Sequence, residues 1–204
     1  MEIVISLIVL IFSVILHELA HGLVADRLGD PTPRLAGRLT LNPRPHIDNM
    51  MSIILPLLLI FSGSPIIIGG AKPMPVDPFN LKDGRKDIAL VALSGPAMNL
   101  ILAIAASIFL RLPIYEFPIL AFILMKIITI NLMLAIFNLL PMPPLDGSKV
   151  FAMILPKREA NAYLSLEKFG MMIIFFLLLF PIAGFSLSSL ISTLLMTSLK
   201  ILLP

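Results

Sequence analysis

Two histidines and a glutamate lie close together near the start of the chain, directly behind a run of Ile, Leu and Val. His17 and His21 are four residues apart, so on a helix they share one face and both imidazoles could reach a single metal ion. Glu18 lies beside them, where a carboxylate could act on a water at that ion rather than bind the ion itself. Two His ligands with a Glu general base at this spacing are typical of zinc-dependent peptide hydrolysis.

This motif is unlikely to be an accident of composition. The chain has three histidines and five glutamates in 204 residues, and at those frequencies the pattern arises by chance in roughly one such chain per thousand. Ionisable side chains within an apolar stretch are also costly in a membrane and indicate function. We therefore interpret His17 and His21 as metal ligands and Glu18 as a catalytic base.

A third ligand is needed, because a catalytic zinc ion usually has three protein ligands and one open position. The stretch FNLLPMPPLDGSKV favours Asp146: its prolines prevent a regular helix, and Gly147 permits a tight turn. Such a break lets the carboxylate bend back towards the first apolar segment. The other candidates are His46, Asp48 and Asp77, of which the first two could instead order their own loop.

The composition indicates an integral membrane protein. Hydrophobic residues make up 58% of the chain and charged residues 13%, against about 45–50% and about 25% in soluble domains. Mean hydropathy is +1.03. The absence of cysteine excludes a disulfide framework, a thiolate zinc site and a cysteine nucleophile. A net charge of +3 favours basic loops on anionic lipid rather than nucleic-acid binding.

Apolar runs predict the membrane segments and a single membrane-embedded domain over 1–204, with a core of 1–160 and a C-terminal helical hairpin of 165–204. We expect the first run to be retained rather than removed as a signal peptide, because no basic region precedes it. Lys126 lies inside the fourth run and could reach the interface or line a wet cavity. The runs are residues 3–24, 51–68, 88–110, 119–140, 169–183 and 185–203.

Basic residues in the loops predict the topology. The loops 26–49, 69–87 and 141–168 each carry four Lys or Arg residues, so the positive-inside rule places all three in the cytoplasm. This requires residues 51–68 to enter and leave on one side, which Pro56 and the Ser-Gly-Ser-Pro turn at 62–65 favour. The expected fold is an all-α polytopic membrane protein with about five transmembrane helices and a re-entrant or β-edge element around the active site.

Four motifs together resemble the site-2 protease family of intramembrane zinc metalloproteases. They are HELAHG, GGAKPMPVDP, ALSGPAMNL and NLLPMPPLDG, and the resemblance covers nearly the whole chain. It implies one zinc ion held by His17, His21 and Asp146, with Glu18 as base, and cleavage of other membrane proteins in or near their membrane segments. The chain has no stretch long enough for a PDZ-like or CBS-like regulatory domain, so it resembles a compact form of the family.

The resemblance also suggests a role for Asn138, just before the Pro-rich break, in orienting substrate or stabilising the oxyanion. An equally open interpretation of Asn138 is a hydrogen bond between helices of the bundle. Asn99 could contact the metal shell or substrate. Residues 66–73, β-branched and then glycine-rich, could offer an edge to which an extended substrate adds, or form a simple turn.

The sequence leaves one alternative function open, a membrane metal-binding or transport protein that uses the same ligands without hydrolysis. A carrier needs the ligands but not the base. A third possibility is a catalytically inactive scaffold, and the complete set of His17, Glu18, His21 and Asp146 argues against it. The expected partners are a transmembrane protein substrate and the lipid bilayer, with no nucleic acid. The expected location is a prokaryotic cell membrane, with the active site towards the cytoplasm.

Overall fold

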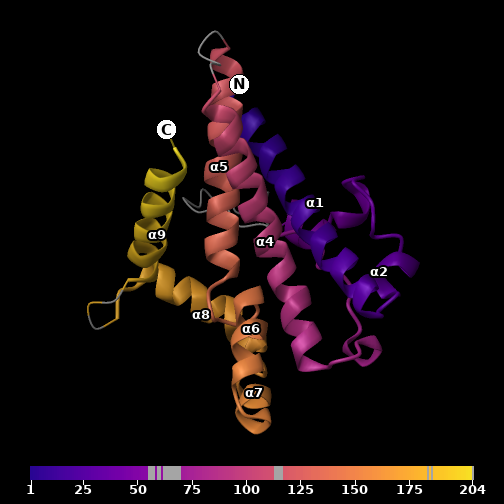
Figure 1. Cartoon of the computed structure of the whole chain (residues 1–204). Coiled ribbons are helices and arrows are strands. Elements are labelled where there is room, and N and C mark those ends of the chain that lie inside the picture. Colours follow the sequence, from indigo (N-terminus) through magenta and orange to yellow (C-terminus); the bar gives the residue numbers. More distant parts are fainter. Residues whose placement is uncertain are drawn as a thin grey trace.

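Three long apolar helices form the centre of the protein in this computed structural model. The structure describes residues 1–54, 58, 61, 70–112, 117–182, 184 and 186–203. The long helices are α1 (Glu2–Leu28), α4 (Arg85–Leu110) and α5 (Pro118–Asn138). Helix α4 packs against both α1 and α5, and α1 also contacts α5. The three run alongside one another in Figure 1.

The ends of these helices follow from local chemistry. Helix α1 ends at Leu28, and Gly29 after it adopts a left-handed conformation with φ 112° that glycine reaches without strain. The N–H of Asp30 then bonds the carbonyl of Ala25 at 2.9 Å and closes the cap. Helix α5 begins at Pro118, whose fixed φ suits a first helical position, and ends at Asn138, shortly before Pro141.

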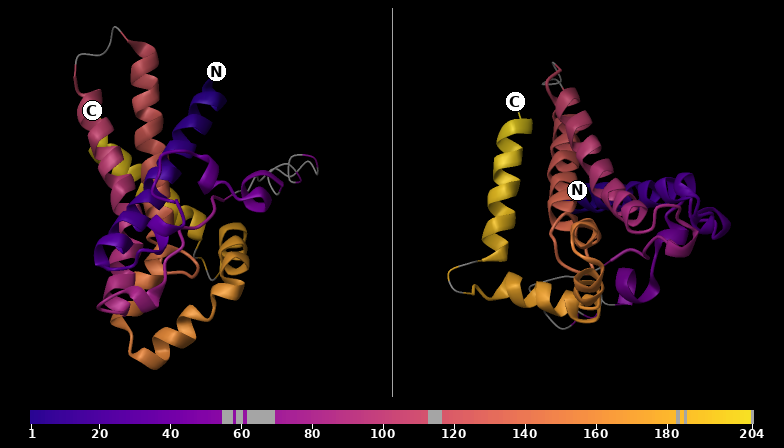
Figure 2. Two further views of the ribbon diagram at one scale, coloured as in Figure 1. Left: turned by 90° about the vertical axis from the view of Figure 1, so that its right-hand side faces the viewer. Right: turned by 60° about the horizontal axis from the view of Figure 1, so that its bottom comes forward.

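Shorter helices complete the fold. Helix α9 (Leu187–Leu202) packs against α5, and its Leu195 and Leu199 cover a buried cluster that includes Leu124, Ile128 and Leu132. Figures 1 and 2 show that α8 lies below the lower end of α9 and is steeply inclined to it. The remaining elements are α2 (Thr32–Leu35), η1 (Arg44–His46), η2 (Asn49–Ile54), η3 (Pro78–Asn80), α6 (Asp146–Ile154), α7 (Lys157–Leu164), α8 (Glu167–Leu179) and α9 (Leu187–Leu202).

The all-α polytopic class predicted from the sequence is confirmed. Among the described residues, three helices are long and apolar enough to cross a membrane, and a fourth span results if the pair α7 and α8, bent by 67°, is counted as one. Helix α9 is a shorter apolar helix of 16 residues. The sequence predicted about five spans because each of the apolar runs 169–183 and 185–203 was counted as one span. Both runs extend beyond the C-terminal ends of the helices α8 and α9, which they overlap.

The predicted re-entrant segment, residues 51–68, lies mostly outside the described residues, but the chain on both sides of it is described. The backbone N–H of Lys72 donates to the carbonyl of His46 at 2.9 Å. The chain therefore returns after residue 68 to the place that it left before residue 51. Of the predicted β-edge at 66–73, residues 70–73 are described and belong to no strand or helix.

Candidate metal centre and active site

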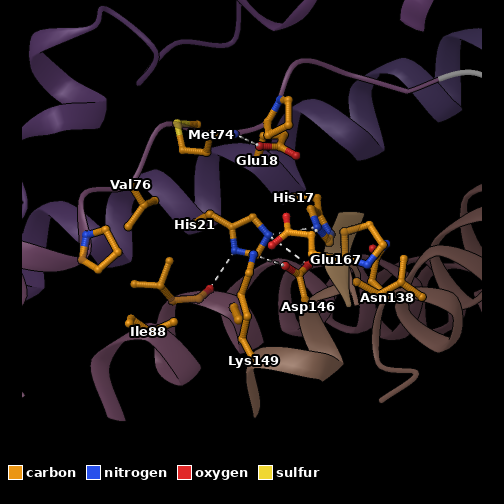
Figure 3. A pocket seen from close by; sticks show the side chains of 16 residues that line it. His17, Glu18, His21, Met74, Val76, Ile88, Asn138, Asp146, Lys149 and Glu167 are labelled. Carbon is orange, nitrogen blue, oxygen red and sulfur yellow. Dashed lines mark hydrogen bonds and ion pairs between the residues drawn. The ribbon is translucent and has the colours of Figure 1, made fainter. Parts of the chain in front are cut away.

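Three side chains predicted as zinc ligands meet at one point, although Asp146 is 129 residues from His17. His17 and His21 project from α1, and Asp146 is the first residue of α6. The two histidine Nε2 atoms are 3.0 Å apart, and each lies 3.2 Å from Asp146 Oδ2. Figure 3 shows the two imidazoles and the carboxylate facing one another. All three residues are buried, and together they could hold a metal ion.

Hydrogen bonds on the far side of each imidazole orient the ring. His21 Nδ1 lies 2.7 Å from the carbonyl oxygen of Val91, which can only accept, so Nδ1 carries the proton. His17 Nδ1 lies 2.6 Å from Asn99 Oδ1. Such partners are what metal-binding histidines have in proteins, because they fix the tautomer that points Nε2 at the ion.

The donor set fits zinc. Two imidazole nitrogens and one carboxylate oxygen are the ligand types of catalytic zinc sites, and three protein ligands leave a fourth position open. The second oxygen of Asp146, Oδ1, lies 3.6 Å from Lys149 Nζ. Burial acts to raise the pKa of Asp146, but the two histidines and Lys149 outweigh it and hold that pKa well below its usual range. The carboxylate is therefore ionised at neutral pH, as a metal ligand must be.

Two glycines allow this close convergence. Gly95 of α4 lies against the histidines: a Cβ at this position would lie 2.5 Å from His21 Nε2 and 2.6 Å from His17 Nε2. Gly147 packs so tightly on the backbone of Leu139 that a Cβ would overlap the carbonyl. The glycine after Asp146 therefore lets α6 start directly beneath the end of α5.

Glu18 lies next to the histidines, at a cavity of about 400 Å³. Its Oε2 accepts a hydrogen bond of 2.6 Å from the backbone N–H of Met74. The cavity is also lined by Asn138, Lys149 and Glu167, and by apolar residues that include Pro73, Met74, Val76, Ile88 and Leu145. It therefore combines a carboxylate, the metal cluster and an apolar wall.

A segment without helix or strand, residues 70–77, borders the cavity and is held near both ends; we call it the strap. At its start, Arg38 donates to the carbonyls of Lys72 at 2.7 Å and Pro73 at 3.2 Å. At its end, the N–H of Asp77 donates to Asp30 Oδ2 at 2.8 Å. The strap places the Met74 N–H at Glu18.

The sequence analysis did not identify Arg38 and Asp30 as contributors to this site. Both are buried charged residues. Burial lowers the pKa of Arg38, and the negative charge of Glu18 opposes that shift. Burial acts to raise the pKa of Asp30, but hydrogen bonds from Thr32, Asn80 and the Asp77 N–H outweigh it, so that pKa is lowered. In the sequence, Arg38 and Asp30 are each a single charged residue, and no neighbouring residue at a regular spacing marks either of them as part of a site.

The other candidates for a third ligand lie outside the metal cluster and order their loops. His46 Nε2 lies 2.9 Å from the carbonyl of Thr40. Asp48 Oδ1 accepts from the Met50 N–H at 2.9 Å, and Asp77 Oδ1 accepts from the Phe79 N–H at 3.0 Å. In the part of the chain that the structure describes, the metal cluster found consists of His17, His21 and Asp146.

Two further polar residues from the sequence analysis acquire partners. Asn138 lines the cavity and donates from Nδ2 to the carbonyl of Leu134 at 2.9 Å, a bond within α5 rather than between helices. Lys126 pairs with Glu2 at 2.7 Å and lies over the ring of Phe122. Lys126 therefore ties the start of α1 to the first half of α5 and does not line the catalytic cavity.

Comparison with known proteins identifies the family. The model of Peptidase family M50 matches residues 5–118 and 114–181. The chain belongs to this family. It is 35% identical over 188 residues to "Putative zinc metalloprotease YwhC" of Bacillus subtilis, with 88% of this chain and 82% of the relative covered. It is 33% identical over 177 residues to "Putative zinc metalloprotease Rip2" of Mycobacterium tuberculosis, with 83% and 64% covered. No solved structure matches the chain.

Family membership confirms the predicted class of enzyme, a zinc metalloendopeptidase, and zinc as its cofactor. The apolar helices add that it is an integral membrane protein. The M50 family thus favours hydrolysis over the alternative of a metal carrier. Because His17, His21 and Glu18 lie within α1, this M50 protein has three of its candidate catalytic groups on a helix long and apolar enough to span a membrane.

Proposed function

We propose that this M50 protein is an intramembrane endopeptidase that cleaves other membrane proteins in or near their membrane segments. One zinc ion per chain would be held by His17, His21 and Asp146. The observation that carries the proposal is the convergence of three candidate metal ligands, two of them on the apolar helix α1, at a cavity that Glu18 also lines. Apolar residues line much of that cavity, which suits a hydrophobic substrate.

Zinc, when bound, polarises the scissile carbonyl and lowers the pKa of a water molecule. Glu18 is the general base that takes the proton from the attacking water and later gives it to the leaving amine nitrogen. The Met74 N–H holds one oxygen of Glu18 at 2.6 Å, so the strap orients the base. Glu18 needs no role in metal binding for this chemistry.

Asn138 is proposed to stabilise the oxyanion. An amide nitrogen has two hydrogens, and one of them bonds Leu134. The other can be donated to the carbonyl oxygen of the substrate as that oxygen gains charge. The bond to Leu134 also fixes the amide rotamer, which keeps this donor in place without movement during the reaction.

The substrate must be extended at the point of cleavage, because a helix hides its carbonyl groups. We propose that it lies along the strap, of which Pro73, Met74 and Val76 line the cavity. Backbone pairing of this kind binds a peptide largely without regard to its side chains. Reconstitution of the purified chain with single-span proteins tests the proposal. Cleavage mapped to a membrane segment supports it, and cleavage confined to soluble loops contradicts it.

The active site is proposed to face the cytoplasm. The N–H of Lys72 donates to the carbonyl of His46, so the basic loops 26–49 and 69–87 contact each other; this supports placing both on the side that the positive-inside rule assigns to basic loops. His17 is seven residues from Val24, the end of the first apolar run, or roughly 10 Å along the helix. The site would then lie below the cytoplasmic surface, and products would be released inward.

Cysteine labelling tests this topology, since the chain has no cysteine of its own. Asn49→Cys and Lys82→Cys place thiols at two exposed positions, one on each loop. Both should react with a membrane-impermeant thiol reagent from the cytoplasmic side of oriented vesicles. Leu112→Cys, at the opposite end of α4, is the control and should react from the other side. Labelling of Asn49→Cys and Lys82→Cys from opposite sides would overturn the topology.

A further inference from the structure

A chain of hydrogen-bonded, buried polar side chains joins the three long helices behind His17. Asn99 of α4 connects His17 to Asn131 of α5, with Asn99 Nδ2 2.8 Å from Asn131 Oδ1. Asn131 Nδ2 lies 2.8 Å from the hydroxyl of Ser13, one turn before His17 on α1. Asn99 and Asn131 are fully buried, and Ser13 is 4% exposed. Each polar group in this apolar interior thus has a partner, as burial demands.

One backbone carbonyl determines which group donates and which accepts in each hydrogen bond between these side chains. Asn131 Nδ2 also lies 2.9 Å from the carbonyl oxygen of Ile127, which can only accept. The amide of Asn131 must therefore present nitrogen to Ile127 and oxygen to Asn99. Asn99 must in turn present its nitrogen to Asn131 and its oxygen, at 2.6 Å, to His17 Nδ1.

This polarity determines the tautomer of His17. Because Asn99 Oδ1 accepts, His17 Nδ1 carries the proton and Nε2 has a free lone pair directed at His21 and Asp146. With both amides reversed, Asn99 would present N–H groups to Nδ1, and the imidazole proton would lie on Nε2, where it blocks the metal. Reversal would also place the Asn131 oxygen against the carbonyl oxygen of Ile127. Both oxygens are acceptors, so the hydrogen bond would be lost and a buried acceptor would be left without a donor.

We propose that Asn99 and Asn131 are positioning residues that hold His17 in its metal-binding tautomer, with Asn131 acting from the neighbouring helix through Asn99. This inference rests on the proposed metal site at His17. It differs from a purely adhesive role for the two amides, in which they would join helices without influence on the metal. An adhesive role predicts lower stability of the bundle and unchanged intrinsic zinc affinity of the folded protein.

Zinc affinity tests the proposal, measured by competition with a chromogenic chelator on purified protein in detergent. Asn131→Leu frees the amide of Asn99 to rotate and should weaken zinc binding about 10-fold or more, within the 10–100-fold range for outer-shell partners of metal ligands. Ser13→Ala leaves the Ile127 bond in place and should change zinc affinity less than about threefold. Ser107→Ala removes another buried interhelical hydrogen bond of α4, to Leu202, and should leave zinc affinity unchanged.

A second background separates positioning from general damage to the fold. Asn99→Asp offers His17 an oxygen in either rotamer, so in this background Asn131→Leu should change zinc affinity by less than about threefold. An equal loss in both backgrounds would overturn the proposal, as would wild-type affinity in Asn131→Leu. Unfolding midpoints verify that each variant is folded, and Asn131→Ala replaces Asn131→Leu in both backgrounds if the latter does not fold.

The outcome does not depend on peptide hydrolysis. If the zinc affinities follow the expected pattern and no membrane protein is cleaved, the positioning role stands and the proposed function fails. If His17→Ala leaves zinc affinity at the wild-type value, the metal site itself is wrongly assigned, whatever the Asn131 variants do. Cleavage together with wild-type zinc affinity in Asn131→Leu supports the enzyme and refutes the positioning role.

Discussion

Glu18→Gln is expected to lower the turnover of a membrane substrate by roughly 10²–10⁴-fold, the range that general bases contribute, and to leave zinc affinity unchanged. Glutamine cannot take a proton from water, but its carbonyl oxygen can still accept the hydrogen bond from Met74 that holds Glu18. The strap and the three metal-binding residues should therefore keep their places. Turnover and zinc content, measured on the same reconstituted preparation, check the two halves of this expectation.

The cavity supplies a matched control for this variant. Glu167 also lines it, from the first turn of α8, and Glu167→Gln removes the same charge without touching the metal cluster. We expect that variant to retain turnover within a few-fold. Equal losses in Glu18→Gln and Glu167→Gln would indicate a general effect of charge and would count against Glu18 as the base.

The inactive variant also provides a way to identify substrates. Because Glu18→Gln should bind substrate and zinc without hydrolysis, a membrane protein captured by it in native membranes should be cleaved by the wild-type chain. Captured proteins that the wild type leaves intact would not be substrates. Zinc flux across vesicles without cleavage of any captured protein would favour the carrier that the sequence left as its alternative.

The metal cluster could be predicted from the sequence because its information is local. The i, i+4 spacing of His17 and His21 specifies a shared helix face, and a Pro-rich break followed by Asp-Gly marks Asp146 as the residue that turns back. The structure brings these three residues together. Their role as zinc ligands, the base role of Glu18 and the oxyanion role of Asn138 are proposals that the experiments above address.

The partners behind the cluster could not be predicted in this way. Asn99 and Asn131 are single polar residues on different helices, and their contact depends on how α4 and α5 rotate against each other. Inside a bilayer, small residues and shape complementarity set that rotation, and no local pattern encodes it. Arg38 and Asp30 likewise became recognisable once the strap that they hold was visible.

The number of spans was also harder to predict than their class. Hydropathy detects an apolar stretch but not where a helix bends or stops, and the run at 169–183 coincides with a helix that is bent by 67° from α7. The positive-inside rule predicted that the segment 51–68 enters and leaves on one side of the membrane, and this stays a prediction. The division of the chain at residues 160–165 stays a prediction.

Gly95→Ala is expected to weaken zinc binding by at least about 100-fold in a protein that still folds. The added methyl carbon would lie 2.5 Å from His21 Nε2 and 2.6 Å from both Nε2 and Cε1 of His17, well inside van der Waals contact. The imidazoles must move away by close to 1 Å. In catalysis a misplacement of that size can lower the reaction rate about 100-fold, and we expect a loss of similar size in zinc affinity. Meanwhile alanine is the better helix former by about 1 kcal/mol, so α4 itself gains stability.

Zinc affinity and the unfolding midpoint of the metal-free protein, measured together, distinguish a local effect from a global one. Ile101→Ala is the control: it lies on the same helix, is 59% exposed and faces away from the cluster, so zinc affinity should match the wild type. A Gly95→Ala protein with wild-type zinc affinity would show that His17 and His21 do not bind the metal from the positions seen here. Loss of folding in Gly95→Ala would instead show that α1 cannot yield at this crossing, and Gly95→Ser, with a side chain of nearly the same size, should then fail to fold as well.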